Sequence, residues 1–134
     1  MTLLPLRLAS GDDLRRAIEA AVASRGASAA FVLSGIGSLS VTKLRLAGAD
    51  AAIEMQGDIE ILTLAGSIAT NGSHLHMSVA DADGRVLGGH AAHGCVVRTT
   101  VELLLALLPA HRFTREADAA TGYEELVIRS IPNT

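Results

Sequence analysis

SHLHMSVADADGRVLGGH, residues 73–90, is the stretch of sequence that decides the fold. Its apolar residues Leu75, Met77 and Val79 alternate with polar ones, which is the period of a β-strand with one buried face. The dipeptide Asp83-Gly84 is typical of a tight hairpin turn. We therefore expect the chain to fold back on itself here, as a hairpin in an antiparallel sheet.

Further strands are expected on both sides of this hairpin. Short apolar or alternating runs bounded by Gly, Asn or Asp are typical of strands, and the turn Asn71-Gly72 leads into the hairpin. Residues 35–38, Gly-Ile-Gly-Ser, are expected to break one such run, and a change of phase between Val41 and Leu44 indicates a β-bulge. The expected strands are 4–8, 29–34, 39–46, 52–56, 60–65, 73–81, the returning strand 85–90 and 124–129.

One helix is expected between these strands, from about residue 10 to residue 26. Its buried stripe has the spacing i, i+4, i+7 and i+8 and consists of Leu14, Ile18, Ala21 and Val22. Ser10 is the expected N-cap, and Asp12 and Asp13 suit the first helical turn. Gly26 is expected to end the helix.

Residues 95–108 can be interpreted in two ways. The alternation from Val97 to Leu105 favours a long strand, whereas the closely spaced leucines that follow Glu102 also suit a second helix. In either case one or two helices accompany a mostly antiparallel sheet, which predicts an α+β fold. A chain of 134 residues has the usual size of one domain, so we expect a single domain over residues 1–134.

The composition excludes several classes of protein. The chain is 49% hydrophobic and 19% charged, which is not the composition of a disordered protein. Its net charge is −3, and acidic residues are interleaved with Arg15 and Arg16, unlike the basic stripe of a nucleic-acid-binding protein. Cys95 is interpreted as a small core residue. Residues 103–110 are too short to span a membrane and residues 1–10 lack a secretion signal, so we expect a cytoplasmic protein.

The histidines of the hairpin form the candidate functional site. His74 and His76 share the strand face opposite Leu75. Counted from the turn, His90 returns opposite His74 or His76. Three neutral imidazoles at one place are suited to zinc or another divalent transition metal, with a further coordination position open to water or substrate.

Two other histidines and one carboxylate complete the set of candidates. His93 could replace His90 as a ligand if the local backbone turns helical, whereas His111 is interpreted as a surface residue. Glu60 lies in line with Leu62 and Leu64, so we expect its carboxylate to be partly buried. Such a group is either a candidate catalytic residue or a member of an ordinary ion pair with an arginine such as Arg45 or Arg98.

Six motifs in order resemble the plant and prokaryote conserved (PPC) domain in its free-standing prokaryotic form, over residues 4–127. They are Leu6-Arg7-Leu8, Gly11-Asp12-Asp13-Leu14, Ala30-Phe31-Val32-Leu33-Ser34-Gly35-Ile36-Gly37-Ser38, Gly57-Asp58-Ile59-Glu60-Ile61-Leu62, His74-Leu75-His76 and Gly88-Gly89-His90.

This resemblance implies a fold and an assembly. It implies a largely antiparallel central sheet of about seven strands flanked by helices, and a homotrimer. In plant members an AT-hook before the domain binds DNA, but this chain has no such basic motif, so nucleic acid is not an expected partner. The plant Gly-Arg-Phe-Glu-Ile-Leu segment supports partner contacts. Here Asp58 and Ile59 replace its Arg and Phe, so that role does not carry over.

The fold family is also similar to that of alpha-acetolactate decarboxylase, which holds zinc with a His-x-His pair and a third histidine. The matching positions here are His74, His76 and His90, while the enzyme's auxiliary arginine and second glutamate have no clear match. Two hypotheses therefore remain. The first is a trimeric metal-binding domain with a small-molecule ligand, in which a metal could act as a Lewis acid or activate water. The second is a non-enzymatic assembly module or a DNA-associated protein.

Overall fold

The computed structural model describes residues 1–132 and contains one helix and eight strands among them. The elements are β1 (Thr2–Ala9), α1 (Leu14–Ser24), β2 (Ala30–Arg45), β3 (Ile53–Ala69), β4 (Gly72–Ala80), β5 (Val86–Ala91), β6 (Val96–Leu107), β7 (His111–Ala117) and β8 (Glu124–Ser130). Six strands form the main sheet in the order β1-β6-β2-β3-β4-β5, and β7 and β8 form a separate pair. Every strand pairing is antiparallel, which confirms the predicted α+β fold with its mostly antiparallel sheet.

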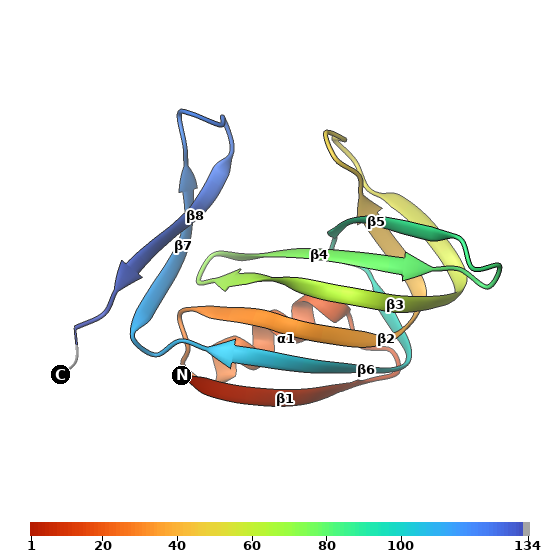
Figure 1. The fold of residues 1–134 in the computed structure, drawn as a ribbon, viewed down its shortest axis with the longest axis horizontal. Coiled ribbons are helices and arrows are strands. Elements are labelled where there is room, and N and C mark those ends of the chain that lie inside the picture. The colour runs from red at the N-terminus through yellow and green to blue at the C-terminus, as the bar shows by residue number, and fades with distance from the viewer. Residues whose placement is uncertain (133–134) are drawn as a thin grey trace.

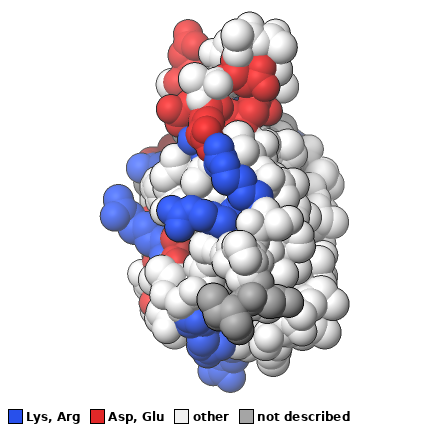
Figure 2. All heavy atoms as spheres, turned by 90° about the vertical axis from the view of Figure 1, so that its left-hand side faces the viewer, with Lys and Arg blue, Asp and Glu red and all other residues white. Residues whose placement is uncertain are grey.

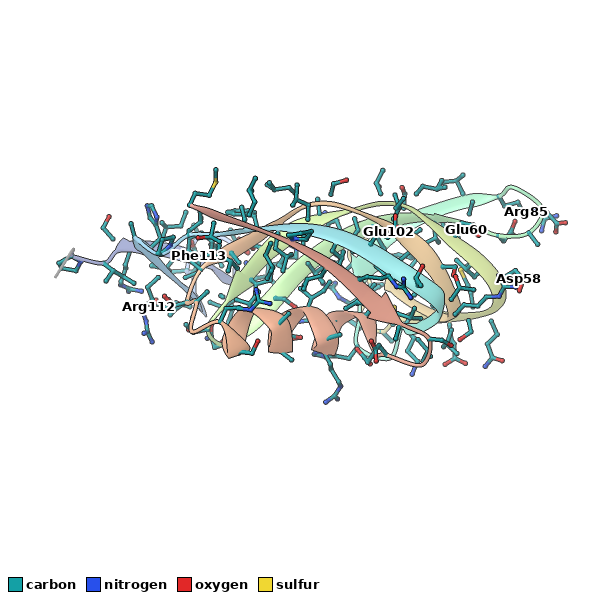
Figure 3. The ribbon with its side chains drawn as sticks, turned by 90° about the horizontal axis from the view of Figure 1, so that it is seen from below. Asp58, Glu60, Arg85, Glu102, Arg112 and Phe113 are labelled. Atoms are coloured by element: carbon teal, nitrogen blue, oxygen red, sulfur yellow. The ribbon has the colours of Figure 1, made fainter. Side chains whose placement is uncertain are left out.

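The molecule has two layers and a projecting arm. Helix α1 lies along one side of the main sheet, and the pair β7–β8 stands apart from it as an arm (Figures 1 and 3). Leu14, Ile18 and Val22 of α1 are buried against the sheet in one apolar cluster. The predicted stripe of the helix is therefore its core-facing side. No helix within residues 1–132 is long and apolar enough to cross a membrane.

The start of the helix differs from the prediction. Asp13 is the N-cap, and its Oδ1 accepts a hydrogen bond of 3.0 Å from the backbone N–H of Arg16. Ser10 and Asp12 lie in the preceding turn, where Oδ2 of Asp12 accepts the N–H of Ala9 at 2.9 Å. Ser10 is therefore not the cap, because the turn after β1 needs three residues before the helix can begin. Gly26, with φ of +66°, follows the last helical turn as predicted.

Strands β2 and β3 are longer than the sequence pattern predicts. The expected break over 35–38 is wrong: β2 continues through it, with irregular register against β6 on either side. Gly37 makes this continuity possible, because a Cβ there would lie 2.5 Å from the backbone oxygen of Thr100. The bulge predicted between Val41 and Leu44 lies earlier in the strand, between Leu39 and Val41. Likewise, the separate strands expected at 52–56 and 60–65 are parts of β3 alone.

The remaining ambiguities concern the C-terminal part of the chain. Residues 96–107 form strand β6, so a second helix is excluded within the described residues. Strand β7 is an element that the sequence analysis did not predict. Phe113 of β7 attaches the arm to the body by an edge-to-face contact with Phe31, with ring centroids 5.6 Å apart. This small second cluster joins the arm to the body, together with backbone hydrogen bonds between Phe113 and both Ser28 and Thr70.

Candidate metal centre

Strands β4 and β5 place three histidines side by side. Leu75, Met77 and Val79 of β4 are buried, so His74 and His76 project from the opposite face, as the alternation predicts. The hairpin register pairs His76 directly with His90. The return of His90 across the turn, predicted from spacing alone, is therefore confirmed.

The three rings form one compact group. Nε2 of His74 and Nε2 of His76 are 3.0 Å apart, and the rings of His74 and His90 stack with centroids 5.3 Å apart. One ligand nitrogen from each ring lies within 4.8 Å of the other two. In a tetrahedral zinc site the nitrogen ligands are about 3.3 Å apart, given zinc–nitrogen bonds of about 2.0–2.1 Å. The donor set and its spacing therefore fit a zinc ion or a similar divalent metal.

The backbone of β2 orients the third ring. Nδ1 of His90 lies 3.1 Å from the carbonyl oxygen of Arg45, a contact in which Nδ1–H donates and Nε2 keeps its lone pair. A metal-binding histidine usually has such a partner for its second nitrogen. The contact exists because β5 also pairs with the end of β2. Gly89 allows this approach, since a Cβ there would lie 2.9 Å from the Arg45 oxygen.

The surroundings of the site favour uncharged imidazoles. Burial, followed by the positive charge of Arg115 and then by the neighbouring histidines, lowers the pKa of His74 to about 4. Burial also lowers the pKa of His76, together with the charges of His90 and Arg45. A neutral imidazole is the form that binds a metal. His74 and His76 are thus held in their ligand form at neutral pH.

A hollow of about 740 Å³ adjoins the histidines. Its size is that of a small-molecule pocket. His74 and His90 line it, together with residues of the β2–β3 loop, the β3–β4 turn and the arm. Three arginines from different parts of the chain also line it: Arg15, Arg45 and Arg115.

Sequence reasoning missed two of these arginines. Arg15 entered the sequence analysis only as an arginine interleaved with acidic residues, yet its Nε and Nη2 donate to the hydroxyl and carbonyl oxygens of Ser73, each at 2.8 Å. Arg115 lies on a strand that was not predicted, and its Nη2 donates to Oγ of Ser67 at 2.6 Å. The position of Arg15 next to the buried-stripe residue Leu14 was the one sequence feature that could have placed it near the sheet. No feature of the sequence around Arg115 indicated its place in the hollow.

Glu60 lies elsewhere on the sheet. Its register partner on β4 is Ala80, whereas His76 pairs with Ala65. Glu60 is exposed, on the side of the sheet away from α1, and lines a second hollow together with Glu102 (Figure 3). The predicted partial burial is therefore wrong, because a bulge after Ile61 turns Leu64 to the core and leaves Glu60 outside. Its catalytic role stays a prediction.

The other candidate side chains are engaged differently. Nε2 of His93 contacts a carboxylate oxygen of Glu19 at 2.8 Å, and His93 does not belong to the three-histidine group. Arg98, suggested as a partner for Glu60, instead forms an ion pair of 3.1 Å with Asp58. Cys95 is fully buried, and burial raises its thiol pKa, as suits a core residue.

Comparisons with known proteins agree with this architecture. Two curated proteins of Synechococcus strains JA-2-3B'a(2-13) and JA-3-3Ab, both named Bifunctional protein GlmU, are 44% identical to this chain over 131 residues. The match covers 98% of this chain but only 21% of each of those proteins. The chain therefore spans about a fifth of the length of the curated relatives it matches.

Solved structures extend the likeness to the fold. A hypothetical protein from Salmonella cholerae-suis is 40% identical, with a TM-score of 0.93 over 96% of this chain and 94% of that one. A metal-containing protein from Archaeoglobus fulgidus is 26% identical, with a TM-score of 0.79 over 95% and 94%. A candidate DNA-binding protein from Bacteroides thetaiotaomicron, at 19% identity and a TM-score of 0.83 over 93% and 91%, shares the fold.

A family model accounts for most of the chain. The model of the Plants and Prokaryotes Conserved (PCC) domain matches residues 1–109, which include β1 to β6 and all three histidines of the site. The arm lies beyond the matched residues. The chain therefore belongs to the Plants and Prokaryotes Conserved domain family, as its sequence motifs predicted.

Proposed function

We propose that this chain is a metal-binding domain over residues 1–134 that holds one divalent transition metal, zinc in the first place, through His74, His76 and His90. The convergence of the three imidazoles carries this proposal. Such a cluster of neutral nitrogen ligands suits zinc, and three ligands are the number used at zinc sites that keep a position open. The solved metal-containing protein of similar fold supports the proposal.

The open position gives the proposed site a role in binding a small molecule. Zinc in such a site supplies Lewis-acid chemistry or activates a bound water. The chain's own residues would orient a ligand in the adjoining hollow, exclude part of the bulk water and keep His90 in its ligand form through the Arg45 carbonyl. The likeness to alpha-acetolactate decarboxylase stays a prediction, and with it any particular reaction.

We also propose that the domain acts as a homotrimer. The sheet presents Leu33, Ile36 and Leu62 with 52%, 51% and 44% of their surfaces exposed. Ile36 and Leu62 line the same shallow hollow. Exposed apolar side chains gathered in this way are typical of protein interfaces. This observation also supports the alternative of a non-enzymatic assembly module. The shallow hollow is lined by Glu60 and Glu102 and by no basic residue, unlike a nucleic-acid-binding surface.

Metal binding by the full chain tests the proposal. Wild-type protein is stripped with a chelator, reloaded with zinc or cobalt, and analysed for metal content and affinity. We expect one metal per chain and a loss of affinity of more than about tenfold in His76→Ala, because removing a ligand costs more than removing the partner of a ligand.

His93→Ala is the matched control for this experiment. His93 is also an exposed histidine near the site in sequence, but it contacts Glu19. We expect this variant to bind metal as the wild type does. Full metal content in His76→Ala, or none in the wild type, would contradict the assignment.

A further inference from the structure

We propose that the hollow binds a small organic acid, and that Arg115 holds the carboxylate of this ligand beside the metal. The ligand class is a carboxylate with an adjacent oxygen, as in 2-oxo and 2-hydroxy acids. This inference rests on the proposed function, since the ligand would bind to the metal held by the histidines.

Arg115 lies on the same face of the sheet as the histidines. Its Nη2 donates to Oγ of Ser67, and Ser67 is the direct register partner of His74 across β3 and β4. Directly opposed residues of an antiparallel pair project to the same side. The guanidinium of Arg115 therefore contacts the residue directly opposite His74. Among the neighbouring charges, that of Arg115 has the largest effect on the pKa of the His74 ring.

The charge balance of the hollow favours an anion once a metal is present. Arg15, Arg45 and Arg115 are opposed by the lining carboxylates Asp50, Glu124 and Glu125, so the side chains alone balance. The three metal ligands are neutral histidines, and no carboxylate within residues 1–132 belongs to that group. A bound divalent metal would add two uncompensated positive charges. An anionic ligand on the metal offsets part of this charge.

Arg115 also has a donor that lacks a partner in the protein. Its Nε is buried and makes no hydrogen bond to any described residue. Buried donors nearly always have partners in folded proteins, and a guanidinium binds carboxylates through two parallel N–H groups. A carboxylate in the hollow would supply the missing acceptor after a small movement of the side chain.

The structure favours a carboxylate over a phosphate. Phosphate sites typically use the free N–H groups of a helix N-terminus. Here the N-terminus of α1 is closed by Asp13, whose carboxylate accepts the N–H groups of Arg16 and Gly94 at 3.0 and 2.7 Å. A metal with three protein ligands leaves one position, and zinc expands to five, which suits two adjacent oxygens of one ligand.

Arg112 provides the matched control for Arg115. Both are arginines of β7, three residues apart, but Arg112 is exposed and does not line the hollow. Arg112 and Phe113 point to opposite sides of the arm (Figure 3). Figure 2 shows the side of the molecule that carries the arm, with acidic side chains gathered at the top and basic ones below. The substitutions Arg115→Gln and Arg112→Gln thus remove the same charge from the same strand.

The experiment titrates oxalate, acetate and inorganic phosphate into the cobalt-loaded full chain. The cobalt absorption spectrum reports ligands on the metal, calorimetry gives affinities, and metal content is measured again after gel filtration. We expect oxalate to change the spectrum and to bind more tightly than acetate or phosphate. In Arg115→Gln we expect oxalate to bind about tenfold more weakly or worse, since a hydrogen bond between charged groups is lost.

Metal affinity separates the possible failures. In Arg115→Gln it is expected to stay the same or rise, because a positive charge beside the cation is gone, and Arg115→Lys should recover part of the oxalate affinity. A protein that binds no metal overturns the proposed function together with this inference. A protein that binds metal, but binds oxalate equally in wild type and Arg115→Gln, overturns the inference alone. Phosphate binding as tight as oxalate binding also overturns it.

Discussion

At the scale of single residues, His74 is the histidine of the site whose protonation is most disfavoured by its surroundings. Its pKa is lowered to about 4, first by burial and then by Arg115 and the two other histidines. In the unfolded chain the same side chain has an ordinary pKa of about 6.5. Between these values the unfolded chain binds a proton that the folded, metal-free protein does not bind. The free energy of unfolding must therefore fall as the pH falls from about 6.5 to 4.

This predicts how the metal-free protein responds to acid. Urea unfolding at pH 7 and pH 5 should show a larger loss of stability for the wild type than for His74→Gln, which cannot take up the proton. The ring resonances of His74 should titrate near pH 4 in an NMR experiment. A midpoint near 6.5 for His74, or equal acid sensitivity of the two proteins, would show that the ring is not desolvated in this way.

The sequence predicts the site better than its surroundings. His74 and His76 share a face because a strand alternates, and His90 faces them because the turn at Asp83-Gly84 sets the register. Both rules act over a few residues. Arg115 reaches Ser67 across 48 positions of the chain, and its strand is attached by a small cluster around Phe113. No local pattern encodes such a contact, so the arginines of the hollow could not be found.

At the scale of the elements, strand β5 shows how backbone contact sets a side chain. It pairs with β4 through five residue pairs and with β2 through two. The second contact brings Gly89 against the backbone of Arg45. Neighbouring Gly88 has more room, because a Cβ there would lie 3.5 Å from the Met77 oxygen, an ordinary contact distance.

Alanine substitutions at the two glycines separate these contacts. Gly89→Ala should push β5 away from β2, lower stability by about 1–3 kcal/mol, as overpacking typically does, and weaken metal binding by displacing His90. Gly88→Ala should change both properties little. Thermal unfolding and metal titration measure the two effects. Equal behaviour of the two variants would mean that the contact with Arg45 does not position His90.

The elements that sequence reasoning misjudged share a physical cause. The break expected at 35–38 rests on glycines, yet Gly37 serves close packing against β6 rather than a turn. Ser10 has the chemistry of an N-cap, but the loop length lets Asp13 take that position. In both cases a residue that suits two roles is assigned by tertiary contacts. Long, regularly alternating segments such as β4 have only one good solution and were predicted well.

At the scale of the whole molecule, the proposed trimer makes a prediction of its own. Sedimentation of the wild type should give three times the chain mass of 13.8 kDa. Leu62→Glu places a charge beside the exposed apolar residue Ile36, which lines the same hollow, and should shift the protein toward monomers, because burying an unpaired charge is costly.

Val86→Glu is the matched control for the assembly. Val86 is 59% exposed and belongs to β5, at the far end of the β4–β5 hairpin. This variant should keep the mass of the wild type. A monomeric wild type would contradict the trimer, and a trimeric Leu62→Glu would place the interface elsewhere.

The double pairing of β5 has one more consequence, for aggregation. Because His90 and Ala91 at the end of β5 also pair with β2, the chain from β2 to β5 curls back onto itself, and this end of β5 offers no unpaired backbone to another molecule. The open border on the other side is β1, which contains Pro5, a residue without an N–H to donate. Each border thus has a feature that limits strand addition along its full length. Both features favour association of copies through the faces of the sheet, where the contacts are made by side chains, over open-ended growth by strand addition.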